Sequence, residues 1–304
     1  MADGEAGKEM TVRYLSLCSG IEAASVAWRP LGWQPVAFAE IEPFPCAVLA
    51  HHYPDVPNLG DMTQVRDWRP YHGAVDLVVA GTPYQDFSIA GKRAGLSGKR
   101  SGLALAFAQV LSVVRPEWIV WENVPGVFST NGGRDFGTFL RALDDIGYSC
   151  AWRVLDAQYF GIPQRRRRVF VVGHLGDWRP AAAVLFEREG VCGDFQKRRT
   201  DGGVFPCLTA KGGTALDDRT PYVLDTAGVR RTTPLEWERL MGFPDGYTAI
   251  EYLGRPAADA PRYKALGNSM AVPVMRWIGE RISRHIKNSS RSSRRLRAAS
   301  DGMR

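Results

Sequence analysis

The chain has 304 residues, of which 45% are hydrophobic and 23% are charged, and its formal net charge at pH 7 is +7. These values are typical of a globular protein with one large domain, and they exclude fibrous and low-complexity classes. No apolar run is long enough to span a bilayer, and residues 1–10 lack the apolar core of a signal peptide, so we expect a cytoplasmic protein.

The five cysteines are scattered along the chain and odd in number. They form neither a zinc-binding spacing nor a disulfide framework, which fits a reducing compartment, and we expect no metal site. The positive charge is uneven, because residues 287–304 carry six basic side chains against one acidic side chain. This segment is rich in serine and lacks apolar periodicity, so it is predicted to be a disordered basic tail. Such a tail either contacts phosphates without specificity or is simply solvated.

The chain begins with two predicted strands, residues 12–17 and 35–39. Between them lies a loop of small residues, 18–24, which precedes a helix and lets backbone N–H groups approach a ligand. Glu40 follows the second strand, about 20 residues after the loop, where an acidic residue usually accepts hydrogen bonds from ribose hydroxyls. Glu42 is a nearby competitor for this role, and a tight turn that binds no ligand is the alternative.

Residues 75–80 form an apolar run that predicts a buried parallel strand. Gly81 and Pro83 end it, so the following side chains lie on a loop at the carboxyl end of the strand, where α/β sheets bind ligands. Residues 88–100 are rich in Gly, Lys and Arg and form either a basic loop over the site or a solvated loop. An amphipathic helix is expected over 102–115.

The strand at 118–121 is followed by Glu122, an acid at a strand end beside a Pro-Gly turn and therefore a candidate for chemistry. A helix is expected over 137–146 and strands over 148–155 and 169–173. Before the last strand stand four consecutive arginines, which an extended segment would point alternately to its two sides. Arg165 and Arg167 are then expected on the surface, and Arg166 and Arg168 on the other side.

The pattern weakens over 175–228, where no long amphipathic period appears. Thr233 and Pro234 begin a helix that Gly242 ends, and a last helix reaches about residue 286. The fold class is therefore α/β. We expect residues 1–174 and 229–286 to form the main domain, 175–228 a small lobe of loops and strands, and 287–304 the tail.

Residues 81–88, Gly-Thr-Pro-Tyr-Gln-Asp-Phe-Ser, resemble the catalytic loop of the DNA cytosine-5 methyltransferases, whose pattern is Gly-x-Pro-Cys-Gln-x-Phe-Ser. Further matches follow in the family's order at Glu122–Val124, at Gln164–Arg168, over 231–245 and over 263–274. The resemblance covers residues 12–286, and the first loop looks most like phage or prophage members. It implies a Rossmann-like S-adenosylmethionine-dependent methyltransferase sheet with a small target-recognition lobe over 175–228.

The resemblance also implies roles for single residues. Glu122 would hold N3 and the amino group of a flipped cytosine, while Arg166 and Arg168 are the matched arginines and Arg168 would donate to the cytosine O2. In the first loop the usual pattern is Phe-x-Gly-x-Gly, and this chain departs from it with Cys18 and Glu22. The implied contacts to S-adenosyl-L-methionine are Cys18, Ser19, Gly20, Ile21, Glu40, Ile41, Asp61, Met62, Pro83, Asn268 and Ser269.

Tyr84 stands at the position of the family's catalytic cysteine. The family reaction needs a thiolate that adds to C6 of the cytosine, whereas a tyrosine hydroxyl has a pKa of about 10 and sits on a bulky ring. Three interpretations remain open: a degenerate inactive relative, a Cys-to-Tyr variant of an active enzyme, or a changed reaction. Cys18 and Cys46 are not proposed as substitutes, and Asp86 adds a negative charge to the loop.

The resemblance implies duplex DNA as the partner, in a bacterial or phage-infected cell, with a role of the restriction-modification type, and we expect a monomer. We therefore predict a DNA cytosine-5 methyltransferase scaffold whose activity is impaired or absent. The alternative is a catalytically silent DNA- or cofactor-binding relative with a regulatory or competitor role. A third class is an RNA methyltransferase on the same scaffold.

Overall fold

A computed structural model of the chain describes residues 11–83, 102–186, 204–208, 222–226 and 228–301. At its centre is a sheet of six strands in the order β2-β1-β3-β4-β6-β5. Strands β1 to β4 run parallel, whereas β6 pairs antiparallel with both β4 and β5. The strands are β1 (Arg13–Leu17), β2 (Gln34–Ala39), β3 (Leu77–Gly81), β4 (Trp118–Asn123), β5 (Tyr148–Asp156) and β6 (Arg167–Leu175).

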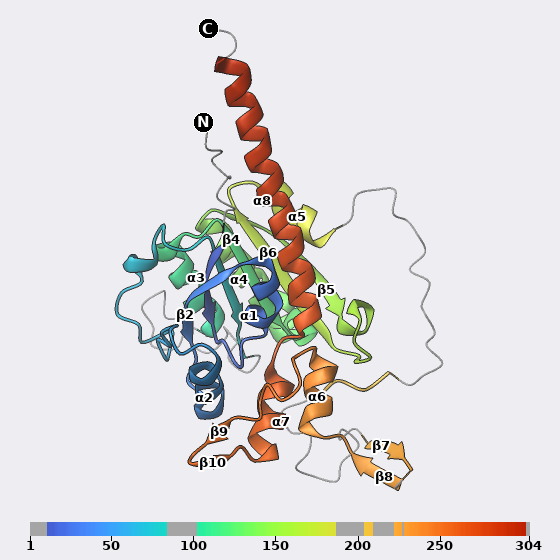
Figure 1. The fold of residues 1–304 in the computed structure, drawn as a ribbon. Helices are drawn as coiled ribbons and strands as arrows, with labels where there is room; N and C mark the ends of the chain where they lie inside the picture. The colour runs from blue at the N-terminus through green and yellow to red at the C-terminus, as the bar shows by residue number, and fades with distance from the viewer. Residues whose placement is uncertain (1–10, 84–101, 187–203, 209–221, 227, 302–304) are drawn as a thin grey trace, which may run out of the picture.

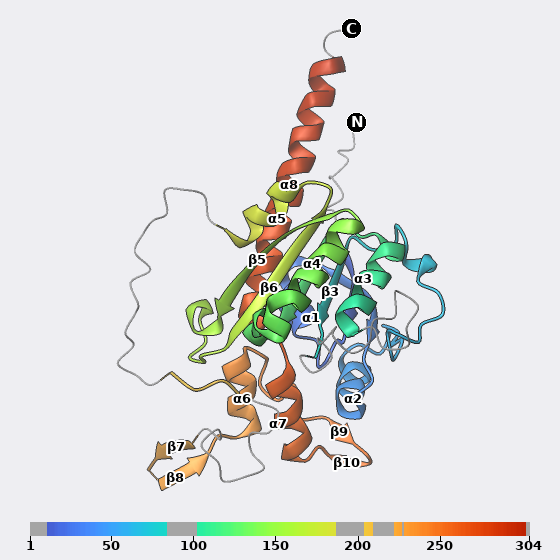
Figure 2. The ribbon, with the colours of Figure 1, turned by 180° about the vertical axis from the view of Figure 1, so that it is seen from behind.

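Helices cover both faces of this sheet, and the α/β fold predicted from the sequence is confirmed (Figures 1 and 2). The helices α1, α5 and α8 lie on one face, and α3 and α4 lie on the other. The helices are α1 (Ala23–Trp28), α2 (Pro43–His52), α3 (Leu103–Val114), α4 (Arg134–Asp145), α5 (Trp178–Leu185), α6 (Pro234–Met241), α7 (Asp259–Asn268) and α8 (Val272–Asp301).

The hydrophobic core consists of two layers, one on each side of the sheet. Successive residues of a strand point to opposite faces, so each central strand contributes to both layers. In β3, for example, Leu77 and Val79 belong to the layer under α1 and α8, while Val78 and Ala80 belong to the layer under α3 and α4. This explains why the central strands read as continuous apolar runs in the sequence.

Beyond the carboxyl ends of the parallel strands lies a second group of elements, made of α6, α7 and two short hairpins (Figure 1). The hairpins are β7 (Tyr222–Asp225) with β8 (Gly228–Arg231), and β9 (Glu251–Tyr252) with β10 (Arg255–Pro256). Helix α6 begins with a capping box in which Thr233 and Glu236 bond to each other's backbone N–H groups, as the expected N-cap at Thr233 requires. Its end at Gly242 has a left-handed backbone.

The prediction of a disordered tail over 287–304 was wrong for residues up to 301. Helix α8 continues to Asp301 and extends away from the body of the molecule (Figure 1). No glycine or proline interrupts residues 280–301, and Arg, Lys and Ala favour a helix. The first turns of α8 are fixed by buried Met275, Ile278 and Ile282, so the helix is already nucleated and propagates outward. Among the described residues no helix has both the length and the apolar character that a membrane span needs.

Candidate active site

The candidate site lies at the edge of the sheet where the parallel strands end. Gly81 of β3 pairs with Glu122 of β4, so the ends of these strands are level with each other. Because β6 is antiparallel to β4, its first residues lie at the same edge, and Asn123 pairs with Val169. The chain direction of β6 therefore brings the arginines that precede its buried part next to Glu122.

The loop after β1 has an unusual backbone. Cys18, Gly20 and Glu22 all have positive φ angles, which is uncommon for residues other than glycine. The loop is held against β2 by Ser19, whose backbone N–H donates to Ala39 O. The backbone N–H of Gly20 donates to Glu40 Oε2 at 2.7 Å. The loop and the acid after the second strand are thus joined by a hydrogen bond, while the predicted contact of Glu40 with ribose hydroxyls stays a prediction.

Glu40 is held by the backbone through both of its carboxylate oxygens. Its Oε1 accepts hydrogen bonds from the backbone N–H groups of Ile41 and Glu42, each at 2.8 Å. With 9% of its surface exposed, the carboxylate is fixed in direction and keeps further lone pairs for a ligand. The competing residue Glu42 instead forms a surface ion pair with Lys264.

A pocket opens beside this loop. Its lining comes from the loop after β1, from Gly81 and Glu122 at the ends of β3 and β4, and from Asn268, Ser269 and Met270 after α7. Chain segments more than 180 residues apart therefore meet here. The predicted cofactor residues that line this pocket are Cys18, Ser19, Gly20, Asn268 and Ser269.

The other predicted cofactor side chains lie elsewhere. Ile21 and Met62 are buried in the two core layers. Asp61 accepts hydrogen bonds from the backbone N–H and the hydroxyl of Thr63 within a turn. Ile41 is 65% exposed, and Pro83 is an exposed residue at the end of a described segment.

Gly81 has no side chain, and Met270 and Glu122 lie close to its Cα. A Cβ atom at this position would stand 2.8 Å from Met270 Cε and 3.6 Å from Glu122 Oε2. The first distance is shorter than any ordinary contact between carbon atoms, so a side chain here would push Met270 aside. Gly81 is therefore packed closely against the flexible end of the Met270 side chain, which would have to shift to admit a methyl group.

Glu122 and Arg168 form a nearly buried ion pair. Arg168 Nε lies 3.2 Å from Glu122 Oε1, and the two side chains are 15% and 10% exposed. Burial raises the pKa of Glu122, while the positive charges of Arg168 and Arg166 act in the opposite direction. The structure thus brings together two of the predicted catalytic residues and places their charged ends beside the pocket.

The guanidinium of Arg166 binds backbone oxygens from three other residues. Its nitrogens donate to Leu208 O at 3.0 Å, to Gly267 O at 3.0 Å and to Ser269 O at 2.6 Å. It is only 2% exposed, and burial lowers its pKa, with the charge of Arg168 adding to this effect. It connects the chain before β6 to the end of α7 and to residues 205–208.

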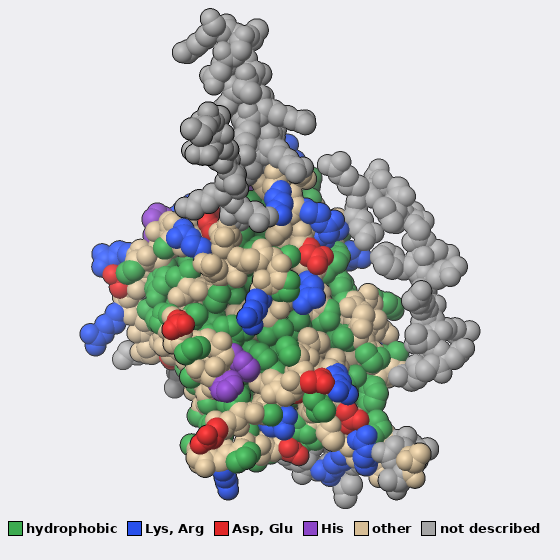
Figure 3. Space-filling model, viewed as in Figure 1, with side chains coloured by type: hydrophobic (Ala, Val, Ile, Leu, Met, Phe, Trp, Pro, Cys, Tyr) green, Lys and Arg blue, Asp and Glu red, His purple; other side chains and the backbone are tan. Residues whose placement is uncertain are grey.

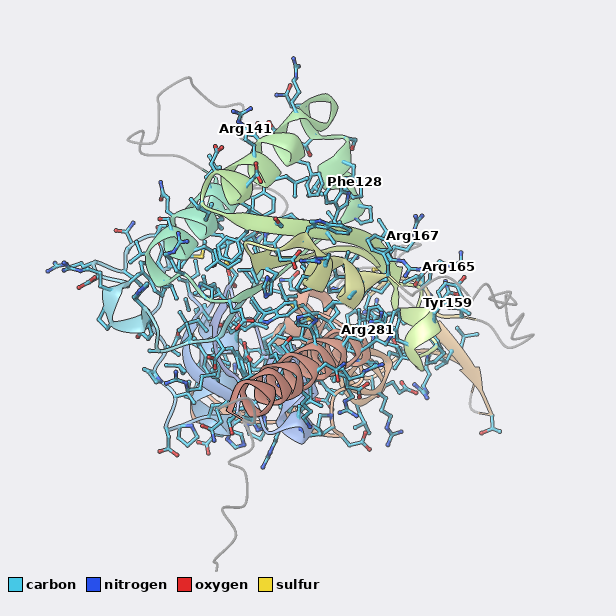
Figure 4. The ribbon with its side chains drawn as sticks, turned by 90° about the horizontal axis from the view of Figure 1, so that it is seen from above. Phe128, Arg141, Tyr159, Arg165, Arg167 and Arg281 are labelled. Atoms are coloured by element: carbon cyan, nitrogen blue, oxygen red, sulfur yellow. The ribbon has the colours of Figure 1, made fainter. Side chains whose placement is uncertain are left out.

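The predicted alternation of the four arginines is confirmed. Arg165 and Arg167 are exposed, whereas Arg166 and Arg168 point inward. Figure 4 shows Arg165 and Arg167 beside Tyr159 along one edge of the molecule. Elsewhere on the surface, basic and acidic side chains are interspersed over the face shown in Figure 3, so charge alone does not mark a binding surface there.

Two positioning residues escaped the sequence analysis. Asn123 Nδ2 donates to the backbone oxygen of Thr82 at 2.8 Å and to its Oγ1 at 3.2 Å, and Trp121 Nε1 also donates to that hydroxyl. These bonds fix the chain where it leaves β3 and enters the predicted catalytic loop. The Glu-Asn-Val triplet at 122–124 could have pointed to Asn123, but the sequence analysis gave a role only to Glu122.

Cys207 is a third residue that the sequence analysis did not place. Its sulfur lies 3.7 Å from Arg166 Nη1 and 3.8 Å from Arg168 Nη1. The thiol is therefore close to the ion pair, although it belongs to the expected recognition region. The residue at the family's nucleophile position, Tyr84, lies outside the described residues, as do Asp86, residues 88–100 and most of residues 175–228.

The chain has the Rossmann-like α/β fold that is also found in solved methyltransferase structures. The crystal structure of the S. pombe Dnmt2 methyltransferase superposes with a TM-score of 0.66 over 90% of this chain and 99% of that chain, at 18% identity. A family model described as C-5 cytosine-specific DNA methylase matches residues 12–190 and 184–284. The chain therefore belongs to the C-5 cytosine-specific DNA methylase family.

The chain is also similar to a type II methyltransferase and to a phage methyltransferase. The type II methyltransferase M2.BsuMI of Bacillus subtilis (strain 168) is 30% identical in an alignment of 304 positions that covers 90% of this chain and 75% of that protein. The DNA N-6-adenine-methyltransferase of Escherichia phage P1 is 31% identical in an alignment of 482 positions that covers 95% of this chain. The chain spans only 64% of the length of that phage protein.

Proposed function

We propose that the chain is a scaffold for methyl transfer from S-adenosylmethionine to C5 of a cytosine flipped out of duplex DNA. The observation that carries this proposal is the Glu122–Arg168 pair beside the pocket. A carboxyl group and a guanidinium held side by side complement the edge of cytosine that carries N3 and O2. Glu122 would bind N3 and the amino group, and Arg168 would donate to O2, where negative charge grows as C6 is attacked.

The Glu122–Arg168 pair is nearly buried, and this limits which substrates can reach it. A base that enters the site must leave the duplex stack, because neither side chain can reach a stacked cytosine from within a nearly buried position. In the free protein each side chain neutralises the other, so the pair is stable without a substrate. A cytosine would take over part of these contacts with its own donors and acceptors.

Residues in and beside the pocket support S-adenosylmethionine as the cofactor. Glu40 lies beside the described lining rather than in it, and its carboxylate accepts a hydrogen bond from the N–H of Gly20, which does line the pocket. This fixed carboxylate has the acceptor oxygens that ribose hydroxyls need. Asn268 and Ser269 line the opposite wall, where the methionine portion would lie. When bound, the cofactor would supply the methyl group on a sulfonium.

Tyr84 makes the expected activity weak or absent. Attack at C6 requires a nucleophile that ionises near neutral pH, and a phenol with a pKa of about 10 supplies very little anion there. The proposal is therefore a methyltransferase scaffold that lacks its attacking thiol. The competing proposal is a silent relative that binds DNA or cofactor and regulates or competes with an active enzyme.

A methyl-transfer assay with tritiated cofactor and duplex DNA tests both proposals. We expect no product with the unchanged chain and measurable product with Tyr84→Cys, which Glu122→Gln should then abolish. Product from neither form would favour the silent binder, and DNA binding measured by fluorescence anisotropy would then show whether any nucleic acid is recognised. Transfer RNA as a competitor in that binding assay tests the RNA methyltransferase alternative.

The position of Cys207 adds one arm to this assay. If the unchanged chain proves active, Cys207 is the first residue to test, since its sulfur is 3.8 Å from Arg168 Nη1. Loss of that activity in Cys207→Ser would show that a thiol outside the usual loop attacks the base. It would also refute our argument that the attacking atom is missing.

A further inference from the structure

A second pocket lies among segments that the proposed function does not use. Its cavity has a volume of about 610 Å³, and pockets that bind small organic molecules typically enclose about 300–1,000 Å³. The lining comes from the end of α1 and the turn that follows it, from the end of α2, from the chain after α6 and from the beginning of α8. Among the described residues, it shares no lining residue with the proposed cofactor pocket, so it is a separate candidate site.

One wall of this pocket is fixed by contacts around Tyr247. The His52 ring stacks on the Tyr247 ring, with 4.0 Å between the ring centroids and 3° between the planes, and His52 Nε2 donates to Tyr247 O at 2.8 Å. The Tyr247 hydroxyl donates to Ile21 O at 2.9 Å, and the Tyr53 hydroxyl lies 3.3 Å from that hydroxyl. A ligand therefore meets a wall that is already ordered, and binding does not have to immobilise these side chains.

The pocket carries an excess of positive charge. Arg29, in the turn after α1, and Arg276, in α8, both line it. Neither guanidinium makes a hydrogen bond or an ion pair with another residue that the structure describes. The lining also contains Asp245, but Arg239 already holds this carboxylate through hydrogen bonds of 2.8 and 2.5 Å. Two arginines without a protein partner at one pocket favour an anionic ligand.

The other side chains of the lining favour a flat apolar group. The Phe243 ring lies 4.9 Å from the Tyr247 ring, measured between centroids. A bare inorganic phosphate would fill only a small part of a cavity of about 610 Å³ and would leave the apolar walls in contact with water. The ligand that matches the whole lining therefore carries an anionic group and a ring. The apolar side chains of the lining are Val26, Pro30, Phe243 and Pro244.

We propose that this pocket binds a phosphorylated small molecule with a flat ring, the chemical class of the nucleoside monophosphates. Arg29 and Arg276 donate to the phosphate oxygens, since a guanidinium offers paired N–H donors in the geometry that a phosphate accepts. The ring lies against the apolar side chains of the lining. This assignment is independent of the proposed function, because it needs neither S-adenosylmethionine nor a cytosine.

Calorimetric titration of the full chain with guanosine and thymidine 5′-monophosphates tests this assignment. Their bases differ from the adenine of the proposed cofactor and from the cytosine of the proposed substrate, which limits binding at the site around Glu122. We expect at least one of the two monophosphates to bind. The matching nucleoside and inorganic phosphate should each bind at least about tenfold more weakly, because each lacks one of the two groups that the lining contacts.

Substitution of the two arginines locates the binding. Arg29→Met and Arg276→Met each remove one charged donor group from an exposed position, so the fold should be kept, as circular dichroism can check. Each should weaken the monophosphate about tenfold or more, since hydrogen bonds between charged groups are among the stronger ones. Arg284→Met is the matched control. It removes the same charge from an exposed position of α8 outside the described lining and should change the affinity less than about twofold.

Other results would overturn the proposal. If neither monophosphate binds, or if all three variants behave alike, this pocket is not the site. If inorganic phosphate binds as tightly as the monophosphates, the ring has no role. Competitive displacement by S-adenosylhomocysteine would assign the monophosphate to the cofactor pocket. A short blunt duplex with 5′-hydroxyl ends presents phosphodiesters only. If it displaces the monophosphate, and Arg29→Met weakens the duplex as well, the pocket belongs to the DNA interface instead.

Discussion

Arg168 Nε lies 3.2 Å from Glu122 Oε1, where the end of a parallel strand meets the beginning of an antiparallel one. The two residues are 46 positions apart in the chain, and only the pairing of β4 with β6 brings them together. Each side chain makes the burial of the other possible, since an isolated buried charge is costly. The pair is therefore both the candidate substrate contact and part of the stability of the site.

Removing Arg168 should change the ionisation of Glu122. Burial already raises the pKa of Glu122 and Arg168 opposes this rise, so Arg168→Leu should raise that pKa further. The titration can be followed by carbon NMR of glutamate-labelled protein, with Glu122→Gln used to assign the signal. Arg167→Leu removes an exposed neighbouring charge and should leave the titration nearly unchanged. An unaltered titration in Arg168→Leu would contradict the ion pair.

Arg166 should contribute to stability more than to chemistry. Arg166→Met would leave the backbone oxygens of Leu208, Gly267 and Ser269 without their donor. We expect a loss of about 3–5 kcal/mol in the free energy of unfolding, measured by chemical denaturation. The control is Arg165→Met on the exposed side of the same segment, for which we expect a change within about 0.5 kcal/mol. Equal effects of the two substitutions would refute the assignment.

Gly81 and Met270 should be coupled. In Gly81→Ala the new methyl group would meet Met270 Cε, and because this flexible side chain can shift, we expect a cost at the lower end of the about 1–3 kcal/mol that is typical of overpacking. Met270→Ala removes the obstacle, so the double variant should recover part of the stability lost by Gly81→Ala. A double-mutant cycle of unfolding free energies measures this coupling. If the two effects are simply additive, the two residues do not make the close contact described here.

Glu22 should make stability fall as the pH rises. Its pKa in the folded protein is about 7, whereas the ordinary value for the side chain is 4.5, so the folded state binds more protons between these values. Its favourable contribution is complete below about pH 4.5 and is lost as the pH rises through 7. Relative to the unchanged chain, Glu22→Gln should therefore gain about 1–3 kcal/mol between pH 5 and pH 8.5. Denaturation curves at both pH values check this, and a pH-independent difference would argue against the raised pKa.

Much of the fold could be predicted because it depends on local patterns. The apolar runs of the central strands are buried on both faces, and they were located to within about two residues at most ends. The N-cap at Thr233 and the alternation of the four arginines also follow from rules that involve only neighbouring residues. The length of α8 was missed because the composition of residues 287–304 suggests disorder. The first half of α8 is packed against the core, and a helix that has already formed extends readily into the following residues.

The sequence by itself determined the family, the α/β class and the order of the motifs, since these are written in residue types and spacings. Only the tertiary structure decided which side chains share the pocket: it separated Arg168, beside Glu122, from Arg166, which binds backbone oxygens. It also placed Ile21 and Met62 in the core, apart from the residues that line the pocket. The physical reason is that direction, burial and hydrogen-bond satisfaction arise from contacts between segments far apart in the chain, and no local pattern specifies them.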